Sequence, residues 1–451
     1  MKQHHSAGTR FCAILAIIVA AFILVSPVAA QTTVDFAGTG DGITDNQAAF
    51  ASAAATLNSA GGGTLRIHAG TYAHSGAVTF GSATNVICDR GAVLKATTDA
   101  SAAMIFTGAN SGIQGCRFIS GAAAQVLANN AAAVFFSDCQ FCYGLGNSIQ
   151  GAAGDGYVVS GAGSQQVEIS GGFVNGVKGY GVYVASGASS VTVDGLQIAG
   201  VGMDCIAAIS VTADGTQVHD VTLSRNQCQS AAQNGIQIAG VLRGNVSGNT
   251  ITGPGFHGII VRNFTPDEAF VPDSIDVRGN AITNQSNPSY YSIGLEATQN
   301  TTASENTIRN SSGIHQWGQS LNLAIARNKL SNIAGDAINL YLTLDHFSVL
   351  ENSISSVTDS CVKAVSVSHG IIAGNACMDF RTSGDATWGA IHVENSQAIC
   401  PVDAASTPVI LSTSGSNASG GNLLAYPGSF DPAVVRMVNS NTSGSNFCMT
   451  F

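Results

Sequence analysis

Seven short segments in the second half of the sequence carry ionisable and aromatic side chains at two fixed positions. In each segment Ile, Val or Leu alternates with other residues, which is typical of a β-strand whose apolar side chains point inward and whose other side chains point outward. The first outward position, here called the first column, holds Gln237, Ile260, Gly294, His315, Asn339, Lys363 and His392. The second column holds Ala239, Arg262, Glu296, Trp317, Tyr341, Val365 and Glu394. We expect both columns on one face of the protein.

The polar members of the two columns suit removal of a proton next to a sugar carboxylate. β-Elimination from a uronate chain needs a group that neutralises the carboxylate and a base that takes the α-proton. A desolvated Lys or a neutral His can act as that base near neutral pH. The predicted catalytic residues are Lys363, His315 and Asp336, and the predicted substrate contacts are Arg262, Glu296, Trp317, Asn339, Tyr341 and His392. Trp317 and Tyr341, on adjacent strands, would form a flat aromatic platform for a sugar ring.

Two other functions remain open from the same residues. A glycoside hydrolase needs two carboxyl groups about 5 to 9.5 Å apart, and Asp336 with Glu296, two strands apart, is the pair nearest to that range. Glu296 and Glu394 would lie four strands, or about 19 Å, apart. A non-catalytic glycan-binding surface protein is the third function, since a fold alone implies no activity. No metal is expected, although Asp336 and Glu296 offer a weak calcium site without a dense carboxylate cluster.

Each of these residues also has a purely structural explanation. Arg262 and Glu296 could form a surface ion pair worth less than about 1 kcal/mol. Lys363 could be a charge that discourages pairing with other strands, and the histidines taken singly are typical of ordinary surfaces. Gln316 falls on an inward position, which indicates a slip of register beside Trp317. The functional hypothesis therefore depends on the coincidence of all these residues on one face.

The strands that would carry both columns belong to a repeat marked by asparagine. Asn residues recur at spacings of 22 to 31 residues, each two places before an apolar residue, at Asn226, Asn249, Asn280, Asn306, Asn328, Asn352 and Asn375. This spacing predicts one supersecondary unit stacked on itself, with the side-chain amides forming a ladder. Upstream, Cys116, Cys139, Gly171 and Leu196 are expected in the Asn place, and Phe118, Phe141, Phe173 and Ile198 in the apolar place. At least eleven coils would then share one register.

Composition identifies the repeating unit as strands. The flanking runs are rich in Val, Ile and Thr, alternate with a period of two and are interrupted by Gly. Charged residues make up 10% of the chain and Gly numbers 53, which fits tight turns and argues against a helical protein. We therefore predict an all-β protein, a parallel β-helix of eleven or more coils and about 50 Å in length, in a single domain.

The N-terminal residues and the charge balance indicate an exported, acidic protein. Lys2 and Arg10 precede or flank an apolar stretch, and small residues lead to an expected cleavage before Gln31, so residues 1–30 are predicted to be a signal peptide, with a signal anchor as the alternative. We expect a secreted or periplasmic protein. Of 17 basic residues, 15 remain after cleavage, against 27 acidic ones. This balance argues against nucleic acid as a partner but allows an acidic polysaccharide in a local groove; the oligomeric state is left open.

Export would allow the cysteines to form disulfides. Removal of the signal peptide leaves ten of the eleven cysteines. Cys116 and Cys139, expected one coil apart in the same place, could form a bridge or remain buried thiols. Cys400 and Cys448 follow the last clear repeat, and we predict that they form a bridge in a C-terminal cap.

Residues 34–72 resemble the entry module of a known superfamily. The turn Gly40-Asp41-Gly42-Ile43-Thr44-Asp45, an Ala-rich helix near Gln47 to Leu57 and the run Gly61-Gly62-Gly63 are similar to the N-terminal module of the pectate-lyase-like superfamily, of the type found in pectate lyases and glycoside hydrolases related to polygalacturonase. His68 stands where that module usually has Pro. The resemblance implies a right-handed parallel β-helix capped by the helix, and a secreted polysaccharide-active protein. The expected divisions are a cap and first coil at 31–75, the β-helix at 76–399 and a second cap at 400–451.

The resemblance does not supply a reaction. The chain lacks the Asn-Thr-Asp, Asp-Asp and Gly-His-Gly motifs that resemble polygalacturonase, and the Asp-Pro-His motif that resembles mannuronan epimerase. Phe256-His257-Gly258 and Ser368-His369-Gly370 are partial matches, and Asp345-His346 matches a lyase motif over two residues. The preference for a lyase therefore rests on the chemistry of the two columns.

Overall fold

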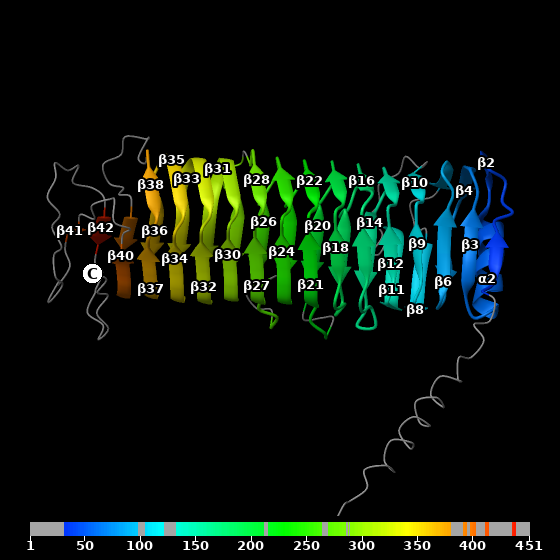
Figure 1. The fold of residues 1–451 in the computed structure, drawn as a ribbon, viewed down its shortest axis with the longest axis horizontal. Helices are drawn as coiled ribbons and strands as arrows, with labels where there is room; N and C mark the ends of the chain where they lie inside the picture. Colours follow the sequence, from blue (N-terminus) through cyan, green and yellow to red (C-terminus); the bar gives the residue numbers. More distant parts are fainter. Residues whose placement is uncertain are drawn as a thin grey trace, which may run out of the picture.

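The protein is an elongated stack of strands in a computed structural model (Figure 1). The structure describes residues 31–97, 104–120, 132–211, 215–263, 269–285, 287, 289–379, 391–394, 397–402, 411–414 and 435–438. The described strands pair in parallel with the strands one coil before and one coil after them. Each full coil contributes one strand to each of three sheets, so the prediction of an all-β parallel β-helix is confirmed.

The first sheet, sheet A, contains 15 strands in order along the axis. They are β1 (Thr33–Asp35), β3 (Gly63–Ile67), β6 (Thr84–Cys88), β9 (Gly112–Gln114), β12 (Tyr143–Leu145), β15 (Glu168–Ser170), β18 (Thr192–Asp194), β21 (His219–Ser224), β24 (Leu242–Ser247), β27 (Asp273–Arg278), β30 (Gln299–Ser304), β32 (Ser320–Ala326), β34 (Leu344–Leu350), β37 (Ser368–Ala373) and β40 (Gln397–Val402).

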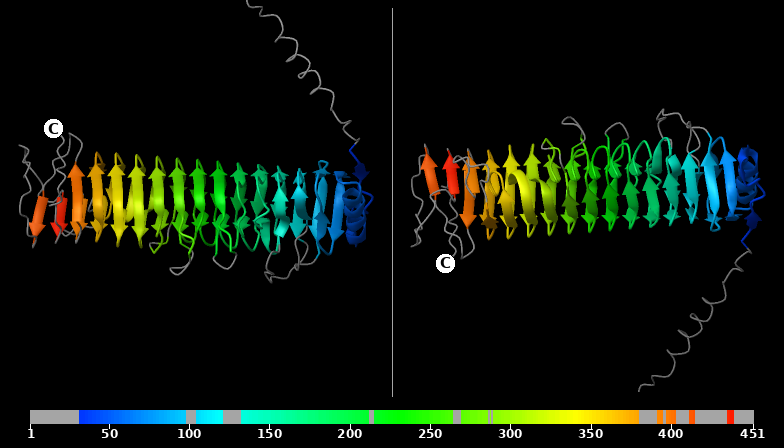
Figure 2. Two further views of the ribbon diagram at one scale, coloured as in Figure 1. Left: turned by 90° about the horizontal axis from the view of Figure 1, so that it is seen from below. Right: turned by 90° about the horizontal axis from the view of Figure 1, so that it is seen from above.

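The other strands form sheets B and C, which β31 (Thr307–Trp317) and β33 (Lys329–Tyr341) join because each runs through both. Sheet B also contains β2 (Asp41–Asp45), β4 (Gly70–His74), β7 (Ala92–Ala96), β10 (Arg117–Ser120), β13 (Ser148–Gln150), β16 (Phe173–Asn175), β19 (Gln197–Ala199), β22 (Gln227–Gln229), β25 (Thr250–Thr252), β28 (Ala281–Thr283), β35 (Ser353–Val357) and β38 (Ala376–Met378). Sheet C also contains β5 (Val78–Phe80), β8 (Met104–Ala109), β11 (Ala132–Gln140), β14 (Asp155–Ser160), β17 (Val182–Ala185), β20 (Ile206–Ile209), β23 (Ile236–Ala239), β26 (Ile259–Arg262), β29 (Ile293–Glu296), β36 (Val362–Val365), β39 (Ile391–Glu394), β42 (Val435–Val438) and β41 (Leu411–Ser414). Figure 2 shows the coils stacked along one axis.

The asparagines form the predicted ladder at the corner between sheets A and B. In each coil the Asn backbone N–H and the side-chain Nδ2 both donate to Oδ1 of the next Asn, at 2.8 to 3.0 Å. The apolar residues two places later stack inside and are at most 1% exposed, at Ile251, Ile282, Ile308, Leu330 and Ile354. Buried amides with every bond satisfied are compatible with a dry core.

The upstream part of this alignment is partly wrong. Asn147 and Gly172, rather than Cys139 and Gly171, continue the file between Cys116 and Leu196, because Ser148 N–H bonds the Cys116 carbonyl and Phe173 N–H bonds the Asn147 carbonyl. Cys139 lies at the end of β11, at another corner of the coil. Phe141 is 48% exposed and Phe173 is half-buried, so neither fills the inner apolar place. Similar short sequences at two corners of one coil explain why these residues are assigned to the wrong corner.

Helix α2 (Gln47–Ser59) lies across the first coil, as expected from the sequence (Figure 1). It buries Phe50 and Leu57 completely, and the Phe50 ring stacks on Phe36 with centroids 4.1 Å apart. At Gly63 the chain passes so close to Thr32 that a Cβ would collide with the Thr32 carbonyl oxygen, which explains the glycine run. Among the described residues, no helix is long and apolar enough to span a membrane.

Four disulfides lie along the described part of the rod. They join Cys88 to Cys116, Cys139 to Cys142, Cys205 to Cys228 and Cys361 to Cys377, with Cα–Cα distances of 4.9 to 6.1 Å. The expected choice between a Cys116–Cys139 bridge and free thiols is therefore wrong on both counts, because the two residues occupy different corners. The predicted Cys400–Cys448 bridge, the signal peptide and most of the C-terminal cap lie outside the described residues.

Candidate functional site

Strand pairing places both columns on the outer side of sheet C, as the alternation predicts. In the first column Gln237 pairs with Ile260, Ile260 with Gly294, Gly294 with His315, His315 with Asn339, Asn339 with Lys363 and Lys363 with His392. In the second column Arg262 pairs with Ala239 and Glu296, Glu296 with Trp317, and Val365 with Tyr341 and Glu394. The predicted site residues of the two columns therefore share one face.

The register does not slip at Gln316. Gln316 is fully buried, its Nε2 donates to the Gly318 carbonyl and to Ser320 Oγ, and its Oε1 accepts the Tyr341 N–H. An inward polar residue is tolerated here because its hydrogen bonds are made inside the coil.

Part of the outer face is covered rather than exposed. Gln237 and Ile260, in the first column, are only 3% and 1% exposed. Farther along the same face, Ala207, Ile209 and Ala239 form a small buried cluster outside the main core, and Tyr180, Tyr183 and Val211 pack against it. Outward residues in this part of sheet C are therefore buried, because Tyr180, Tyr183 and Val211 pack over the strands.

A third column, missed by the sequence reasoning, stands at the corner where the chain enters sheet C. Its members are Asp155, Tyr180, Asp204, Asn234, His257 and Tyr291. The backbone carbonyls from Tyr180 to Tyr291 each accept a hydrogen bond from the preceding coil, and Asp155 Oδ1 accepts the Tyr180 N–H. The signal was a polar or aromatic residue directly before a small residue and a strand, as in Asp204-Cys205 and His257-Gly258. We call this the corner column.

The upstream end of the corner column holds two carboxyl groups, of which Asp204 is buried and Asp155 is partly buried. Burial raises the pKa of Asp155 to about 6, and burial likewise raises the pKa of Asp204 to about 6 although Asn234 and Arg262 oppose that shift. Asp204 Oδ1 accepts from the Asn234 backbone at 2.7 Å and its side chain at 2.9 Å. The Gln237 amide, oriented to satisfy its neighbours, donates to Asp204 Oδ2 at 2.8 Å and accepts from Arg262 at 3.2 Å.

An aromatic wall follows downstream, made of His257, Tyr291, His315 and Trp317. The Tyr291 and His315 centroids are 4.1 Å apart, and Trp317 stacks on His257 at 5.9 Å and meets His315 edge-on at 5.3 Å. The ring contacts described for Trp317 are with these residues and not with Tyr341, which is 42% exposed. The predicted flat platform is therefore replaced by a wall turned toward the corner column.

The last part of the site surrounds the predicted catalytic residues. Lys363 Nζ lies 3.6 Å from Asp336 Oδ2, and Asp336 Oδ1 accepts the Ser360 N–H at 3.0 Å. Burial raises the pKa of Asp336. Burial also lowers the pKa of His315 to about 4, so its imidazole is neutral at neutral pH. His315 Nδ1 and the Asn339 side-chain oxygen, on paired positions, are buried with no hydrogen-bond partner. His392 is 4% exposed and lies 3.3 Å from Glu394.

Two parts of the predicted site do not come together. Arg262 lies four strands from Lys363, or about 19 Å, and it contacts the Asp204 cluster, so it does not join the His315 group. Asp336 stands at the corner, whereas Glu296 aligns with Trp317 at the opposite end of its strand. Their separation combines two strand spacings with roughly 16 Å along the strand, so they cannot act as a hydrolytic pair or share a calcium ion.

The comparisons with known proteins agree on the fold. The family described as a right handed beta helix region matches residues 102–267. A thermostable GH87 α-1,3-glucanase catalytic unit from Streptomyces thermodiastaticus matches with a TM-score of 0.58 and 15% identity, over 93% of this chain and 72% of that one. The surface protein and adhesin PfbA of Streptococcus pneumoniae matches with a TM-score of 0.53 and 14% identity, over 82% and 100%. The Agl-KA catalytic domain matches with a TM-score of 0.51 and 14% identity, over 83% and 68%.

A search of curated protein sequences finds no match. At these identities the structural likeness establishes the architecture alone, and that architecture is the right-handed parallel β-helix expected from the pectate-lyase-like entry module.

Proposed function

We propose that this protein is an exported enzyme that binds a polysaccharide across sheet C and cleaves it by β-elimination. One observation carries the proposal: His315 Nδ1 and the Asn339 side-chain oxygen are buried, adjacent and without partners beside an aromatic wall. Unpartnered buried polar atoms are costly unless a ligand satisfies them. Sugar hydroxyls can bond to both atoms, while the apolar face of the ring packs on an aromatic side chain.

The cleavage step assigns a role to each predicted catalytic residue. When a uronate binds, Lys363 moves its ammonium group from Asp336 to the sugar carboxylate. It neutralises that carboxylate and so stabilises the negative charge that develops next to it. The neutral His315 imidazole takes the α-proton. The carbon–hydrogen bond and the bond to the leaving sugar oxygen break, and a carbon–carbon double bond forms. The leaving oxygen takes a proton from solvent water, and His315 returns the α-proton to solvent. Asp336 holds Lys363 in place between turnovers.

Two other findings support a role in glycan chemistry outside the cell. One structural neighbour is a glucanase and another is a surface adhesin, and both share this architecture over most of the chain. Four disulfides are typical of proteins from oxidising compartments.

A product assay tests the proposal. The enzyme is incubated with a panel of polyuronates, and unsaturated sugars are measured by ultraviolet absorbance. We expect Lys363→Ala and His315→Ala to lower turnover by about 100-fold or more, whereas His219→Ala, an exposed histidine on sheet A, should match the wild type. Wild-type turnover in both site variants would contradict the assignment of these residues.

Glycoside hydrolysis is the second candidate, and the two carboxyl groups at the upstream end of the corner column favour it. Asp155 and Asp204 lie in the same column two coils apart, or about 10 Å, at the upper end of the spacing for inverting hydrolysis. Both carboxyl groups have a pKa raised to about 6 by burial, which suits a general acid. This candidate predicts new reducing ends without unsaturated product, lost in Asp155→Asn and Asp204→Asn but retained in Lys363→Ala. Tight binding without turnover, unaffected by Lys363→Ala, would identify a binding protein.

A further inference from the structure

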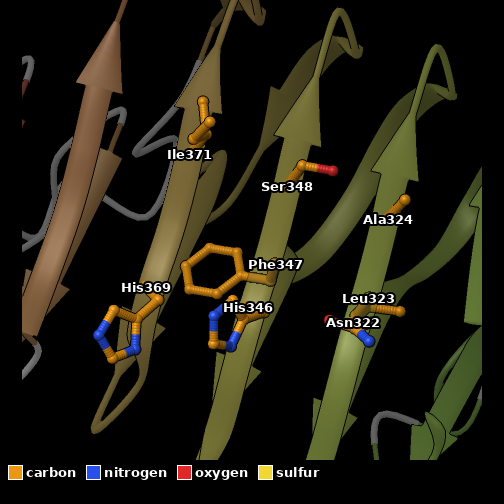
Figure 3. A pocket seen from close by; sticks show the side chains of 8 residues that line it. All are labelled: Asn322, Leu323, Ala324, His346, Phe347, Ser348, His369 and Ile371. Carbon is orange, nitrogen blue, oxygen red and sulfur yellow. The ribbon is translucent and has the colours of Figure 1, made fainter. Parts of the chain in front are cut away.

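A second cluster of ionisable side chains lies on sheet A, which is not the sheet that carries the two columns. Asp345 and His346 are on β34, and His369 is on β37 in the next coil. Asp345 Oδ1 lies 2.6 Å from His369 Nδ1, and Asp345 Oδ2 lies 3.0 Å from His346 Nδ1. The two imidazole rings stack with centroids 5.0 Å apart. Figure 3 shows both rings side by side on neighbouring strands.

The backbone explains why these two histidines meet. Asp345 pairs with Ser368 and Phe347 with Gly370, so the residues between them, His346 and His369, face each other. Both have a positive φ, of 56° and 51°. The same position has a positive φ in earlier coils, at Asp220, Arg243, Ser274, Asn300 and Asn322. The local conformation is therefore a property of the repeat, and the two adjacent imidazoles are specific to these coils.

The donor set is that of a transition-metal site. One ligand atom from each of Asp345, His346 and His369 lies within 4.8 Å of the others, a combination found nowhere else among the described residues. Imidazole nitrogen with carboxylate oxygen suits Zn²⁺ and its neighbours rather than Ca²⁺ or Mg²⁺, which prefer oxygen alone. Both histidine side chains are more than half exposed, so an ion could reach them from solvent.

The chain contains related clusters that lack this capacity. At the equivalent position four and five coils earlier, Asp220 is paired with Arg243 and with its neighbour His219. A guanidinium has no lone pair to offer a metal. His68 contacts Asp35 and Asp89 through its two ring nitrogens, so that cluster has a single imidazole. Hydrogen bonding between His and Asp is thus common on this surface, and within the part of the chain that the structure describes only one cluster adds a second imidazole.

We propose that Asp345, His346 and His369 bind one divalent transition-metal ion, with Zn²⁺ the best suited, and that water completes its coordination. The ligands come from two consecutive coils, so the ion ties β34 to β37 on the outer surface of the rod. His346 and His369 themselves line a shallow, open hollow together with Phe347 and Ile371 (Figure 3). The proposal is independent of the chemistry assigned to sheet C.

Cobalt binding tests the site, because four-coordinate Co²⁺ absorbs visible light and replaces Zn²⁺ in such donor sets. We expect saturable binding of one Co²⁺ at this site, displaced by Zn²⁺, and a higher thermal midpoint with Zn²⁺ than without it. His346→Ala and His369→Ala should each weaken binding by about 10-fold or more, and both should fold, since the side chains are exposed. His219→Ala is the matched control and should bind as the wild type does.

Other ligands in the chain are separable from this site. His4 and His5, and cysteines outside the four described disulfides, are present in every variant and give a common background. If the visible absorption of the wild-type cobalt complex consists of a thiolate-to-cobalt band that is unchanged in His369→Ala, the metal is bound by cysteine and the proposal is overturned. Absence of saturable binding, or equal binding in wild type, His346→Ala and His369→Ala, would overturn it as well.

Discussion

In and beside sheet C, acidic side chains and histidines have opposite effects on how the stability of the fold depends on pH. Asp155 and Asp204 have a pKa raised to about 6 by burial, so the folded protein holds their protons more tightly than the unfolded chain does. Their contribution to stability is present at acidic pH and is lost as pH rises through about 6. Burial lowers the pKa of His257 and of His315 to about 4, so their contribution is present above about pH 6.5 and is lost as pH falls through 4. Between pH 4 and 6 the two effects largely cancel.

The substitution Asp204→Asn should remove part of the acidic contribution to this pH dependence and leave the histidine contribution in place. The substitution removes a group whose ionised form is disfavoured in the fold, so the free energy of unfolding near pH 8 should rise by about 2 kcal/mol. The histidines remain, so the variant should lose more stability than the wild type when the pH is lowered from about 6 to 4. Urea unfolding at several pH values measures both slopes. Parallel stability profiles for the two proteins would contradict the assigned pKa of Asp204.

The position of the Trp317 ring depends on the absence of a side chain at Gly294. A Cβ at Gly294 would lie 3.0 Å from the Trp317 ring, 2.7 Å from Ile260 and 3.2 Å from His257. Gly294→Ala should therefore displace the aromatic wall and weaken glycan binding about as much as Trp317→Ala, which removes about 1 kcal/mol of ring stacking. Titration calorimetry compares the two, with Trp317→Phe as a control that keeps a ring. Unchanged affinity in Gly294→Ala would place the sugar elsewhere on sheet C.

Among the elements, the Asn ladder is the most sensitive to a single change. Asn306 is fully buried; its oxygen accepts two bonds from Asn280, and its Nδ2 donates to the Val277 carbonyl and to Asn328. Asn306→Ala leaves several buried groups unpaired and should lower the free energy of unfolding by about 3 kcal/mol. Asn375→Ala, in a residue that is 8% exposed, should cost less because water can reach the freed groups. Equal losses, measured by urea unfolding, would argue against this explanation.

The strands and their register could be predicted wherever one corner of the coil was marked by Asn. From Asn226 to Asn375 the spacing and the inward apolar residues agree with the structure, because a β-strand alternates with a fixed period of two. Upstream, Cys139 and Gly171 were placed at the wrong corner because Asn147 stands alone and small residues recur at more than one corner. Disulfide partners depend on those corners, so the cysteine pairing could not be predicted either.

For the whole rod, the N-terminal cap should be essential for solubility. Helix α2 covers the end of the first coil and buries Phe50 and Leu57. Deletion of residues 35–60 would expose that coil's edge and its apolar interior, and we expect the truncated protein to aggregate. Size-exclusion chromatography of the two proteins, expressed side by side, gives the answer. A monomeric, folded truncated protein would show that the coils need no cap at this end.

The outer surface of the rod was harder to predict than its interior. Alternation placed Lys363, His315 and Asn339 on one face, and the structure keeps them adjacent. Alternation could not indicate that rings in the corner column pack over sheet C. The direction in which a turn places its side chains depends on contacts between residues from several coils. Asp204 was therefore passed over, and Arg262 was assigned to the wrong neighbours.

The Asn ladder also has a direction, which bears on how the chain is made. Every ladder oxygen faces the preceding coil. One Nδ2 hydrogen of Asn249 donates to the Leu223 carbonyl behind it, but its backbone N–H and its other Nδ2 hydrogen have their acceptor only once the coil carrying Asn280 is in place. The neighbouring parallel sheets have no such bias, because their N–H groups point both ways along the axis. A nascent chain leaves the ribosome from its N-terminal end. Each completed coil then presents a pair of unpaired N–H donors to the segment synthesised next. We therefore expect the rod to fold coil by coil from its N-terminal end during translation.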